Sequence, residues 1–242
     1  ARAVQRFINE EMEREFPLKL FRDRSGEVEP IRRPKSDFSK ATLDRIFGFS
    51  GGQEMAALED PDFPARGIKI AGFGGQGVMS MGLTITRAAY NGGRFVSWYP
   101  DYGPEQRGGT SNCSVVISGL PIGSPAADHP DVLVAFNKPS LMKFASTVRR
   151  GGLILYDSMA GGFEAPHQVK ATAIPASHIA AERGAPRAAN TVMLGALIET
   201  GALGVSREVF TGFLYGKSHP KELDLVSLNP DLLDAGAKAV TK

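Results

Sequence analysis

The chain has 242 residues, of which 42% are apolar and 22% charged, so it is long enough to bury a core of its own. The 28 Lys and Arg residues nearly balance the 26 Asp and Glu residues, and a net charge of +2 argues against a nucleic-acid or anionic-membrane binder. The one cysteine, Cys113, excludes an internal disulfide and an iron-sulfur cluster held by this chain alone, and it favours a reducing, cytoplasmic location. Because no apolar run is long enough to cross a bilayer and residues 1–15 are charged, we expect neither a membrane span nor a secretory leader.

Glycine and charge divide the chain into two parts. Residues 1–50 contain only two of the 28 glycines but 11 basic and 9 acidic side chains, whereas residues 51–242 hold the other 26 glycines. We therefore predict an extended N-terminal arm over residues 1–65 and a second domain over residues 66–242, joined by the loop-like Glu59–Pro64. Local patterns in the arm predict a helix, a short strand and a second helix, at Val4–Met12, Phe16–Arg22 and Ser39–Phe47. The arm has few large apolar side chains, which favours a segment that packs on another surface; a small independent subdomain is the alternative.

The second part alternates strands and helices as α/β domains do. Short apolar runs predict five strands, at Ile68–Ala71, Arg94–Tyr99, Ser114–Ile117, Val132–Phe136 and Gly152–Tyr156. Helical spacing predicts five helices, at Gly77–Ala89, Pro139–Val148, Ala176–Arg183, Ala188–Thr200 and Arg207–Tyr215. This alternation predicts a doubly wound, mostly parallel and Rossmann-like sheet with right-handed crossovers.

A glycine-rich turn, Gly72–Gly77, follows the first predicted strand and opens the first helix. It fits the pattern G-x-G-x-x-G, in which glycines permit a tight turn and let the backbone approach a phosphate at the helix N-terminus. A dinucleotide site also needs a carboxylate at the end of the second strand, but Ser97–Tyr99 occupies that place, and Asp101 follows a proline in what we expect to be a loop. A dinucleotide site, a site for the phosphate of another ligand and a purely structural turn therefore remain open.

The connection Tyr99–Ser111 is the second dense motif, at the carboxyl end of the second strand, where open α/β sheets place ligands. Arg107 beside Gly108 and Gly109 offers a planar charge next to accessible backbone amides, which suits a phosphate or a carboxylate. The equally weighted alternative is a rigid loop that docks on a partner protein.

Other polar residues give weaker signals. The four histidines have no metal-ligand spacing, so we expect surface histidines, and Cys113 is predicted to be a small buried side chain. Asn137 follows an apolar strand and either reaches the same cleft or caps the next helix, while capping is the expectation for Asn190.

Residues 68 to about 240 resemble the γ subunit or γ domain of the 2-oxoacid:ferredoxin oxidoreductases, the group that includes the pyruvate, 2-oxoglutarate, 2-oxoisovalerate, indolepyruvate and phenylglyoxylate enzymes. Six segments in order carry the resemblance: Gly72–Gly77, Tyr102–Gly109 with Ser111, Ser124–Pro125, Pro130–Asn137, Asn190–Gly195, and Leu228–Asn229 with Ala235–Gly236. The arm, with Phe16–Pro17–Leu18, is similar to the C-terminal tail of the thiamine-diphosphate-binding β subunit, but it lacks that subunit's cysteines and its diphosphate- and Mg²⁺-binding motif.

The resemblance implies an oxidoreductase that acts as a multisubunit complex, as in anaerobic metabolism. The complex decarboxylates a 2-oxo acid with coenzyme A to acyl-CoA and CO2, and electrons pass from thiamine diphosphate through [4Fe-4S] clusters to ferredoxin or a similar acceptor. Partners would be the α, β and ferredoxin-like δ subunits, which supply the thiamine diphosphate, Mg²⁺ and clusters. This chain alone would hold no metal and no complete catalytic site, and we expect the choice of 2-oxo acid to reside in other subunits.

The resemblance and the two motifs together give one set of candidate cofactor-binding residues, with no catalytic residue in this chain: Gly72, Gly74, Gly75, Gln76, Gly77, Arg107, Gly108, Gly109, Thr110, Ser111 and Asn137. We expect the backbone of Gly74–Gly77 and the turn at Arg107 to face coenzyme A or the approach to the active site. A free-standing dinucleotide-binding dehydrogenase and a purely structural interaction module are the alternatives.

Overall fold

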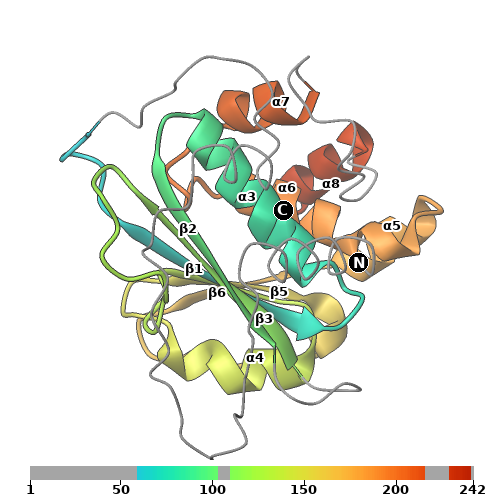
Figure 1. Ribbon diagram of the computed structural model, residues 1–242. Coiled ribbons are helices and arrows are strands. Elements are labelled where there is room, and N and C mark those ends of the chain that lie inside the picture. The colour runs from blue at the N-terminus through green and yellow to red at the C-terminus, as the bar shows by residue number, and fades with distance from the viewer. Residues whose placement is uncertain (1–58, 103–109, 216–228, 241–242) are drawn as a thin grey trace, which may run out of the picture. The chain divides into compact units, whose positions relative to one another are not determined.

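A computed structural model describes residues 59–102, 110–215 and 229–240, all of which belong to the unit Gln53–Lys242 (Figure 1). The three elements expected in the arm lie outside the described residues. The division between an arm and a γ domain at residue 65 stays a prediction, although the first strand, β1, does begin at Arg66.

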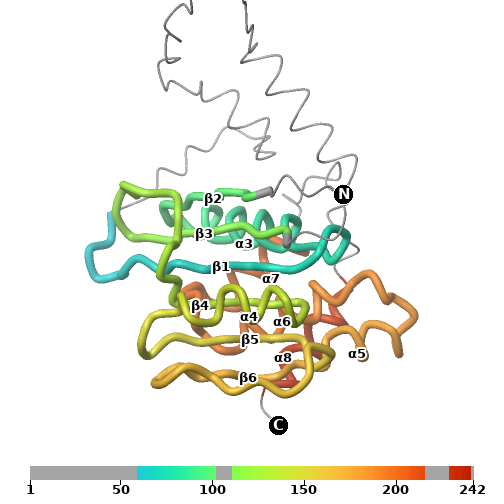
Figure 2. Tube along the Cα trace, turned by 90° about the horizontal axis from the view of Figure 1, so that it is seen from below, coloured from blue at the N-terminus to red at the C-terminus, as the bar shows by residue number. Residues whose placement is uncertain are grey.

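Six strands form one mixed sheet in the described part of the chain: β1 (Arg66–Phe73), β2 (Phe95–Tyr102), β3 (Thr110–Ser118), β4 (Val132–Ala135), β5 (Leu153–Asp157) and β6 (Lys170–Ile174). Their order across the sheet is β2-β3-β1-β4-β5-β6, which Figure 2 shows in one view. Strands β1, β4, β5 and β6 are parallel, whereas β3 runs antiparallel to both β1 and β2. The α/β fold with a doubly wound sheet is confirmed, with β3 inserted as an antiparallel strand.

The antiparallel strand follows from the length of its connection. Only seven residues, 103–109, separate β2 from β3, and a parallel neighbour needs a crossover of a dozen or more residues. Two adjacent strands joined by so short a segment must run in opposite directions. In this sheet β3, rather than β2, lies beside β1, which differs from the strand order of a dinucleotide-binding unit.

Strand β2 is longer than the sequence predicts. It continues through Pro100 to Tyr102, and Asp101 pairs with Asn112 of β3, so the expectation that Asp101 lies in a loop is wrong. β2 is the outer strand of the sheet, and an edge strand tolerates a proline because the missing N–H faces away from the ladder. Strand β6 was not expected at all; it is short, and only Ile174 of its five residues is buried.

Helices cover both faces of the sheet (Figure 1). They are α3 (Val78–Asn91), α4 (Lys138–Phe144), α5 (Ala176–Glu182), α6 (Ala189–Glu199), α7 (Arg207–Tyr215) and α8 (Pro230–Val240), with short 3-10 turns at Ala145–Thr147, Ser158–Ala160 and Pro186–Ala188. On one face, α4 and the turn after it enclose a smaller apolar cluster: Leu133, Ala135, Leu141, Ala145, Val148, Ile154, Tyr156 and Ala160. The larger core lies on the opposite face, between the sheet and α3, α5, α6, α7 and α8. None of the helices in the described ranges is long and apolar enough to cross a membrane.

Helix α6 is buried along almost its whole length. Met193, Leu194 and Leu197 are all buried, and so are their neighbours around the helix. The reason is α8, an element the sequence patterns did not predict, which packs against α6 at two glycines. A Cβ at Gly195 would lie 2.0 Å from the carbonyl oxygen of Leu233, and one at Gly236 would lie 1.8 Å from that of Val192.

The segment before β1 packs on the sheet as well. The guanidinium of Arg94 pairs with the Asp60 carboxylate at 2.5 Å and lies 4.1 Å from the centre of the Phe63 ring. The hydrogen bond from Arg94 is the main cause that lowers the pKa of Asp60. The Asp60 amide also donates to the carbonyl of Gly119, just after β3, at 2.7 Å. An ion pair and a backbone hydrogen bond therefore both attach this segment to the sheet.

Candidate functional site

The carboxyl ends of β1 and β4 meet at the point where the sheet changes direction. From β1 the chain continues through α3 toward β2 on one side, and from β4 it continues through α4 toward β5 on the other. The two connections therefore diverge and leave a crevice between neighbouring strands, which is where open α/β sheets bind their ligands. The glycine-rich turn lies on one side of this crevice and Asn137 on the other.

The turn has the strand-to-helix context that the sequence predicts. Gly72 is buried at the end of β1, and a Cβ there would come within 2.9 Å of both the Gln76 side chain and Val78. Gly75 and Gly77 have φ angles of 94° and 76°, which L side chains rarely adopt, and Gly77 is the N-cap of α3. Gly74 and Gly75 are exposed with no atom within 4 Å of the place of a Cβ, so their backbone is the open part of the turn.

The side chain of Gln76 folds back into the crevice instead of pointing away from it. Its Oε1 accepts hydrogen bonds from the Phe73 amide at 2.7 Å and from Asn137 Nδ2 at 2.9 Å. Its Nε2 donates to the carbonyl of Phe136 at 3.3 Å. One side chain thus joins the turn after β1 to the turn after β4.

Asn137 uses both ends of its amide within the protein. Its Oδ1 accepts from the Ser140 amide at 2.9 Å and caps α4, while its Nδ2 donates to Gln76. The capping alternative is therefore what the structure shows. Asn190 behaves differently from expectation: it is the second residue of α6 and makes no cap, and a Cβ at Gly77 would lie 2.4 Å from its Nδ2. At 4% exposure it packs directly beneath the turn.

The start of β3 lies beside the glycine-rich turn. Thr110 pairs with Phe73, and Ser111 pairs with Gly72 on one side and with Tyr102 on the other. The β3 end of the connection 103–109 is therefore next to the end of β1, and its β2 end lies one strand further away. Arg107, Gly108 and Gly109 lie outside the described residues, so their role stays a prediction.

A polar row on the α4 side of the sheet was not predicted. Lys69 Nζ donates to Ser114 Oγ at 3.0 Å and to Asn112 Oδ1 at 3.3 Å, and Asn112 Nδ2 donates to Asp101 at 3.1 Å. The sequence did contain a signal for this row. Lys69 lies between Ile68 and Ile70, and because successive side chains of a strand point to opposite faces, Lys69 must face the other side of the sheet from these two isoleucines. We interpret the row as a satisfied polar network that links three strands.

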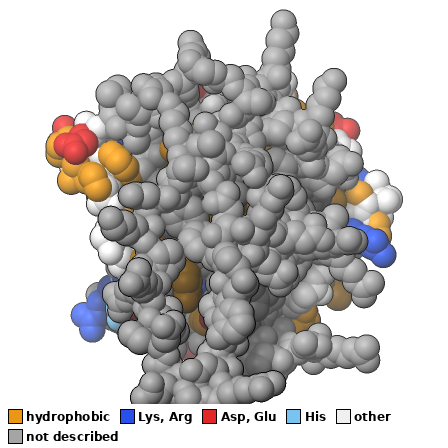
Figure 3. All heavy atoms as spheres, viewed as in Figure 1, with side chains coloured by type: hydrophobic (Ala, Val, Ile, Leu, Met, Phe, Trp, Pro, Cys, Tyr) orange, Lys and Arg blue, Asp and Glu red, His pale blue; other side chains and the backbone are white. Residues whose placement is uncertain are grey.

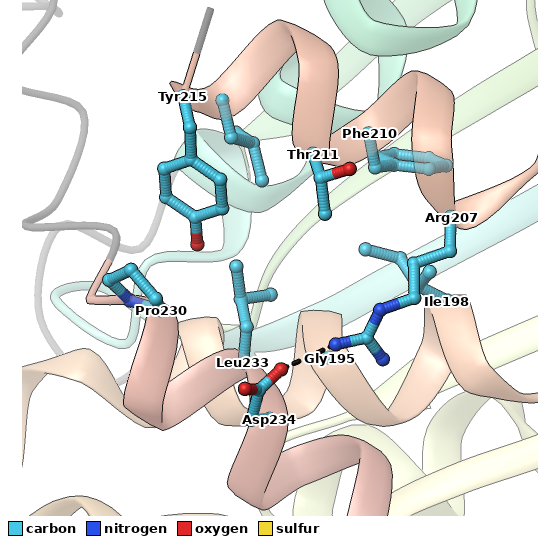
Figure 4. Close-up of a pocket in the computed structure, with 10 residues that line it drawn as sticks. Gly195, Ile198, Arg207, Phe210, Thr211, Tyr215, Pro230, Leu233 and Asp234 are labelled. Atoms are coloured by element: carbon cyan, nitrogen blue, oxygen red, sulfur yellow. Dashed lines mark hydrogen bonds and ion pairs between the residues drawn. The ribbon is translucent and has the colours of Figure 1, made fainter.

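A shallow hollow between α6, α7 and α8 lies away from the turn (Figure 4). Its floor is apolar, with Ile198, Phe210 and Leu233, and Arg207 at its edge pairs with both Glu199 and Asp234. Burial raises the pKa of Tyr215 at the same edge. None of the predicted site residues lines this hollow. On the face shown in Figure 3, the described side chains that can be seen lie mainly at the margins and include hydrophobic, acidic and basic ones.

Cys113 is fully buried under α3, where a Cβ at Gly82 would lie 2.6 Å from its Sγ, and burial raises the pKa of its thiol to about 12. We therefore expect no reaction of the folded chain with iodoacetamide at pH 8 and complete reaction in denaturant, measured by the mass of the intact chain. Because the folded thiol keeps its proton between about pH 9 and pH 12 while an unfolded thiol loses it, this group's contribution to stability falls as the pH rises through that range. Rapid labelling of the folded chain would contradict the buried position.

Residues 67–239 match the family model described as pyruvate ferredoxin/flavodoxin oxidoreductase. The chain belongs to this family. The pyruvate ferredoxin/flavodoxin oxidoreductase match covers the described α/β domain from β1 to α8, and it includes both glycine-rich motifs.

Two relatives illustrate the similarity. The ketoisovalerate oxidoreductase subunit VorA of Methanothermobacter marburgensis is 52% identical over 237 residues, which is 98% of this chain and 49% of VorA. The 2-oxoglutarate synthase subunit KorC of Methanothermobacter thermautotrophicus is 40% identical over 148 residues, 57% of this chain and 78% of KorC. The chain thus spans about half the length of VorA, and the VorA alignment includes nearly all of the predicted arm.

Two solved structures share the fold. The keto/oxoacid ferredoxin oxidoreductase γ subunit of Geobacter sulfurreducens superposes with a TM-score of 0.60 at 27% identity, over 73% of this chain and 98% of that subunit. The 2-oxoglutarate:ferredoxin oxidoreductase of Magnetococcus marinus, solved with 2-oxoglutarate, coenzyme A and succinyl-CoA bound, superposes with a TM-score of 0.63 at 29% identity, over 74% of this chain and 31% of that one. The resemblance to γ subunits of this family is confirmed.

Proposed function

We propose that this chain is the γ-domain part of a coenzyme A-acylating 2-oxoacid oxidoreductase whose substrate is ketoisovalerate (3-methyl-2-oxobutanoate). One observation carries the proposal: the 52% identity to VorA, which runs through almost the whole chain, including the part that KorC does not match. The arm is proposed to be the tail of a β region that precedes the γ domain. An identity of 52% over almost the whole chain supports the same kind of enzyme complex as that of VorA, and not merely the same fold.

The proposed reaction converts a 2-oxo acid anion and coenzyme A into an acyl-CoA, CO2, one proton and two electrons. The carbon–carbon bond to the carboxylate breaks, a thioester bond forms, and the electrons pass to ferredoxin or a similar acceptor. Thiamine diphosphate, when bound in the complex, supplies the stabilisation of the carbanion left by decarboxylation. The complex is proposed to be cytoplasmic and to contain α, β and ferredoxin-like δ subunits.

This chain's own residues do not fit a cluster or a thiamine site. A [4Fe-4S] cluster takes four thiolates, and the chain has one cysteine, which is buried. Within residues 59–102, 110–215 and 229–240, no three His, Cys, Asp or Glu side chains come together as metal ligands would. The redox groups are therefore assigned to the partner subunits.

The contribution proposed for this chain is to hold an anionic part of coenzyme A. The open backbone at Gly74 and Gly75 lies next to the N-terminus of α3, and helix N-terminal amides favour an anion. Gly74, Gly75, Gly77, Thr110 and Ser111 are proposed to lie around the bound group, together with the turn Arg107–Gly109. The other three candidates, Gly72, Gln76 and Asn137, are proposed to shape the turn from within the protein, because Gly72 is buried and the side chains of Gln76 and Asn137 bond to each other and to the backbone. Arg107 would add a charge-assisted contact from the neighbouring connection.

The alternative of a free-standing dinucleotide-binding dehydrogenase has no support. In such a unit the second strand lies beside the first and ends in a free carboxylate for the ribose. Here β3 separates β1 from β2, and the carboxylate near the end of β2, Asp101, accepts a hydrogen bond from Asn112. The side chain of Gln76 also occupies the crevice between β1 and β4.

The proposal is tested with the native complex that contains this chain, purified without oxygen. Reduction of methyl viologen is followed with ketoisovalerate, pyruvate and 2-oxoglutarate, each with and without coenzyme A. We expect a brown complex whose reduction of the dye requires coenzyme A and is fastest with ketoisovalerate. A colourless chain that binds NAD and reduces no dye would overturn the proposal, and a preference for pyruvate or 2-oxoglutarate would overturn the assigned substrate.

Arg107→Ala tests the predicted contact to coenzyme A. The loss of one charge-assisted hydrogen bond, of about 1.5 to 3 kcal/mol, should raise the KM for coenzyme A roughly 10-fold to 100-fold in the complex. Arg150→Ala is the matched control, because Arg150 is exposed and lies before β5, at the other end of the sheet. Unchanged KM and turnover in Arg107→Ala would remove Arg107 from the site.

A further inference from the structure

We propose that Gln76 is a positioning residue: its side chain, held by Asn137, locks the glycine turn in the shape that offers Gly74 and Gly75 to coenzyme A. The inference rests on the proposed function, since it names the residue that prepares the same site. Gln76 is given an indirect role, because its side chain makes three hydrogen bonds to other groups of the described structure.

The first step is the fit of Gln76 inside its own turn. The Gln76 amide donates to the carbonyl of Phe73 at 3.2 Å, while its Oε1 accepts from the Phe73 amide at 2.7 Å. The side chain therefore closes a ring across Gly74 and Gly75, and Gly72 leaves room for it because a Cβ there would lie 2.9 Å from Oε1. Because the turn holds three glycines after Phe73, among them Gly75 with a φ angle of 94° and Gly77 with one of 76°, an unclamped turn would have many other conformations open to it.

The second step is the connection to β4. Gln76 reaches the carbonyl of Phe136 and the Nδ2 of Asn137, and the Oδ1 of Asn137 is in turn held by the first turn of α4. A short loop is thus fixed against a strand and a helix, the rigid elements of the domain. Hydrogen-bonded support of this kind sets the geometry of a binding group without contact to the ligand.

The open tip of the turn distinguishes a role of Gln76 in binding from a role in folding stability alone. No atom of the described structure lies within 4 Å of the position that a Cβ would take at Gly74 or Gly75. The tip of the turn is therefore not packed against other residues, and the hydrogen bonds of Gln76 are not needed to hold such a contact. If the turn only connected β1 to α3, its loss of order would affect folding and leave ligand affinity unchanged. A binding role predicts the opposite pattern.

Two variants of the full complex remove the clamp in different ways. Gln76→Met keeps the length of the side chain and removes all three hydrogen bonds. Asn137→Ser keeps a good helix cap but is too short to reach Gln76. If Gln76→Met prevents folding, Asn137→Ser alone tests the clamp, because it removes the bond between Asn137 and Gln76 and leaves Gln76 in place. Lys170→Met, an exposed change on β6 at the far edge of the sheet, is the control.

We expect Gln76→Met and Asn137→Ser each to raise the KM for coenzyme A about fivefold or more, with kcat within about twofold of the parent complex. In the double variant the second change should add nothing, since both remove one clamp. Hydrogen exchange should become faster at the amides of residues 73–77. Lys170→Met should change neither KM nor exchange.

The parent complex separates the two proposals. If its activity does not depend on coenzyme A, the proposed function fails. If it does depend on coenzyme A and the variants keep the parental KM, or if the two effects simply multiply in the double variant, the positioning role of Gln76 is wrong while the proposed function stands.

Discussion

Gly195→Ala should unfold this domain at a markedly lower temperature. The new methyl group would lie 2.0 Å from the Leu233 carbonyl oxygen and 2.7 Å from its carbon, and backbone atoms of α8 cannot rotate away as a side chain tip can. Helices α6 and α8 would have to separate along a contact that buries Val192, Leu232 and Leu233. We expect a loss of about 3 kcal/mol, which corresponds to roughly 6 to 12 °C in Tm for a chain of this size.

The measurement is thermal unfolding followed by the fluorescence of Trp98, the one tryptophan in the chain. The matched control is Gly212→Ala, on the exposed face of α7, where no atom lies within 4 Å of the new methyl group. That change should be neutral or stabilising by about 0.5 to 1 kcal/mol, because alanine is the better helix former. Equal Tm values for the two variants would show that α8 does not pack on α6 through Gly195.

Gly77→Ala should damage both stability and the proposed binding site. Its φ of 76° is costly for any L side chain, and the methyl group would meet Asn190 at 2.4 Å. Strain and overpacking together should cost about 2 to 4 kcal/mol. Because Gly77 sets the start of α3, we also expect kcat/KM for coenzyme A to fall at least about 10-fold in the complex.

Two comparisons separate the causes of the Gly77→Ala effect. Gly75→Ala has a positive φ of 94° but open space around it, so it should show the strain alone, about 1 to 2 kcal/mol. Asn190→Ala removes the group that the new methyl group meets, and Gly77→Ala should cost less in that background. If Gly77→Ala costs the same with and without Asn190, the contact between the turn and α6 is not as described.

The elements that could be predicted are those whose own residues carry the pattern. Strand β4 and its neighbour β5 are short apolar runs buried on both faces, and α3 begins where a glycine turn ends an apolar strand. Helix α8 was missed although local signals were present, since Asn229 accepts a hydrogen bond at its start, Pro230 opens it and Asp231 lies in its first turn. What its own residues do not show is the packing against α6, which depends on two glycines more than thirty residues apart in sequence. Strand β6 has an exposed and partly buried pattern of small residues, which local sequence does not distinguish from a loop.

The candidate site shows the same limit. The sequence places Gly72–Gly77 between strand and helix, and the structure confirms that place. It does not reveal that Gln76 turns inward to Phe136 and Asn137, because that contact spans about sixty residues and depends on which strands are neighbours. Likewise, the insertion of β3 beside β1 removes the geometry of a dinucleotide site, and only the strand order shows it.

If this chain works in a coenzyme A-acylating 2-oxoacid oxidoreductase, the complex must release an acyl-CoA. The complex purified with this chain is given ketoisovalerate, coenzyme A and an oxidised viologen dye, and the thioesters formed are identified by mass spectrometry. We expect isobutyryl-CoA and CO2 in equal amounts, with two electrons delivered to the dye for each thioester. Electron transfer without any acyl-CoA, or the absence of any reaction with 2-oxo acids, would contradict it.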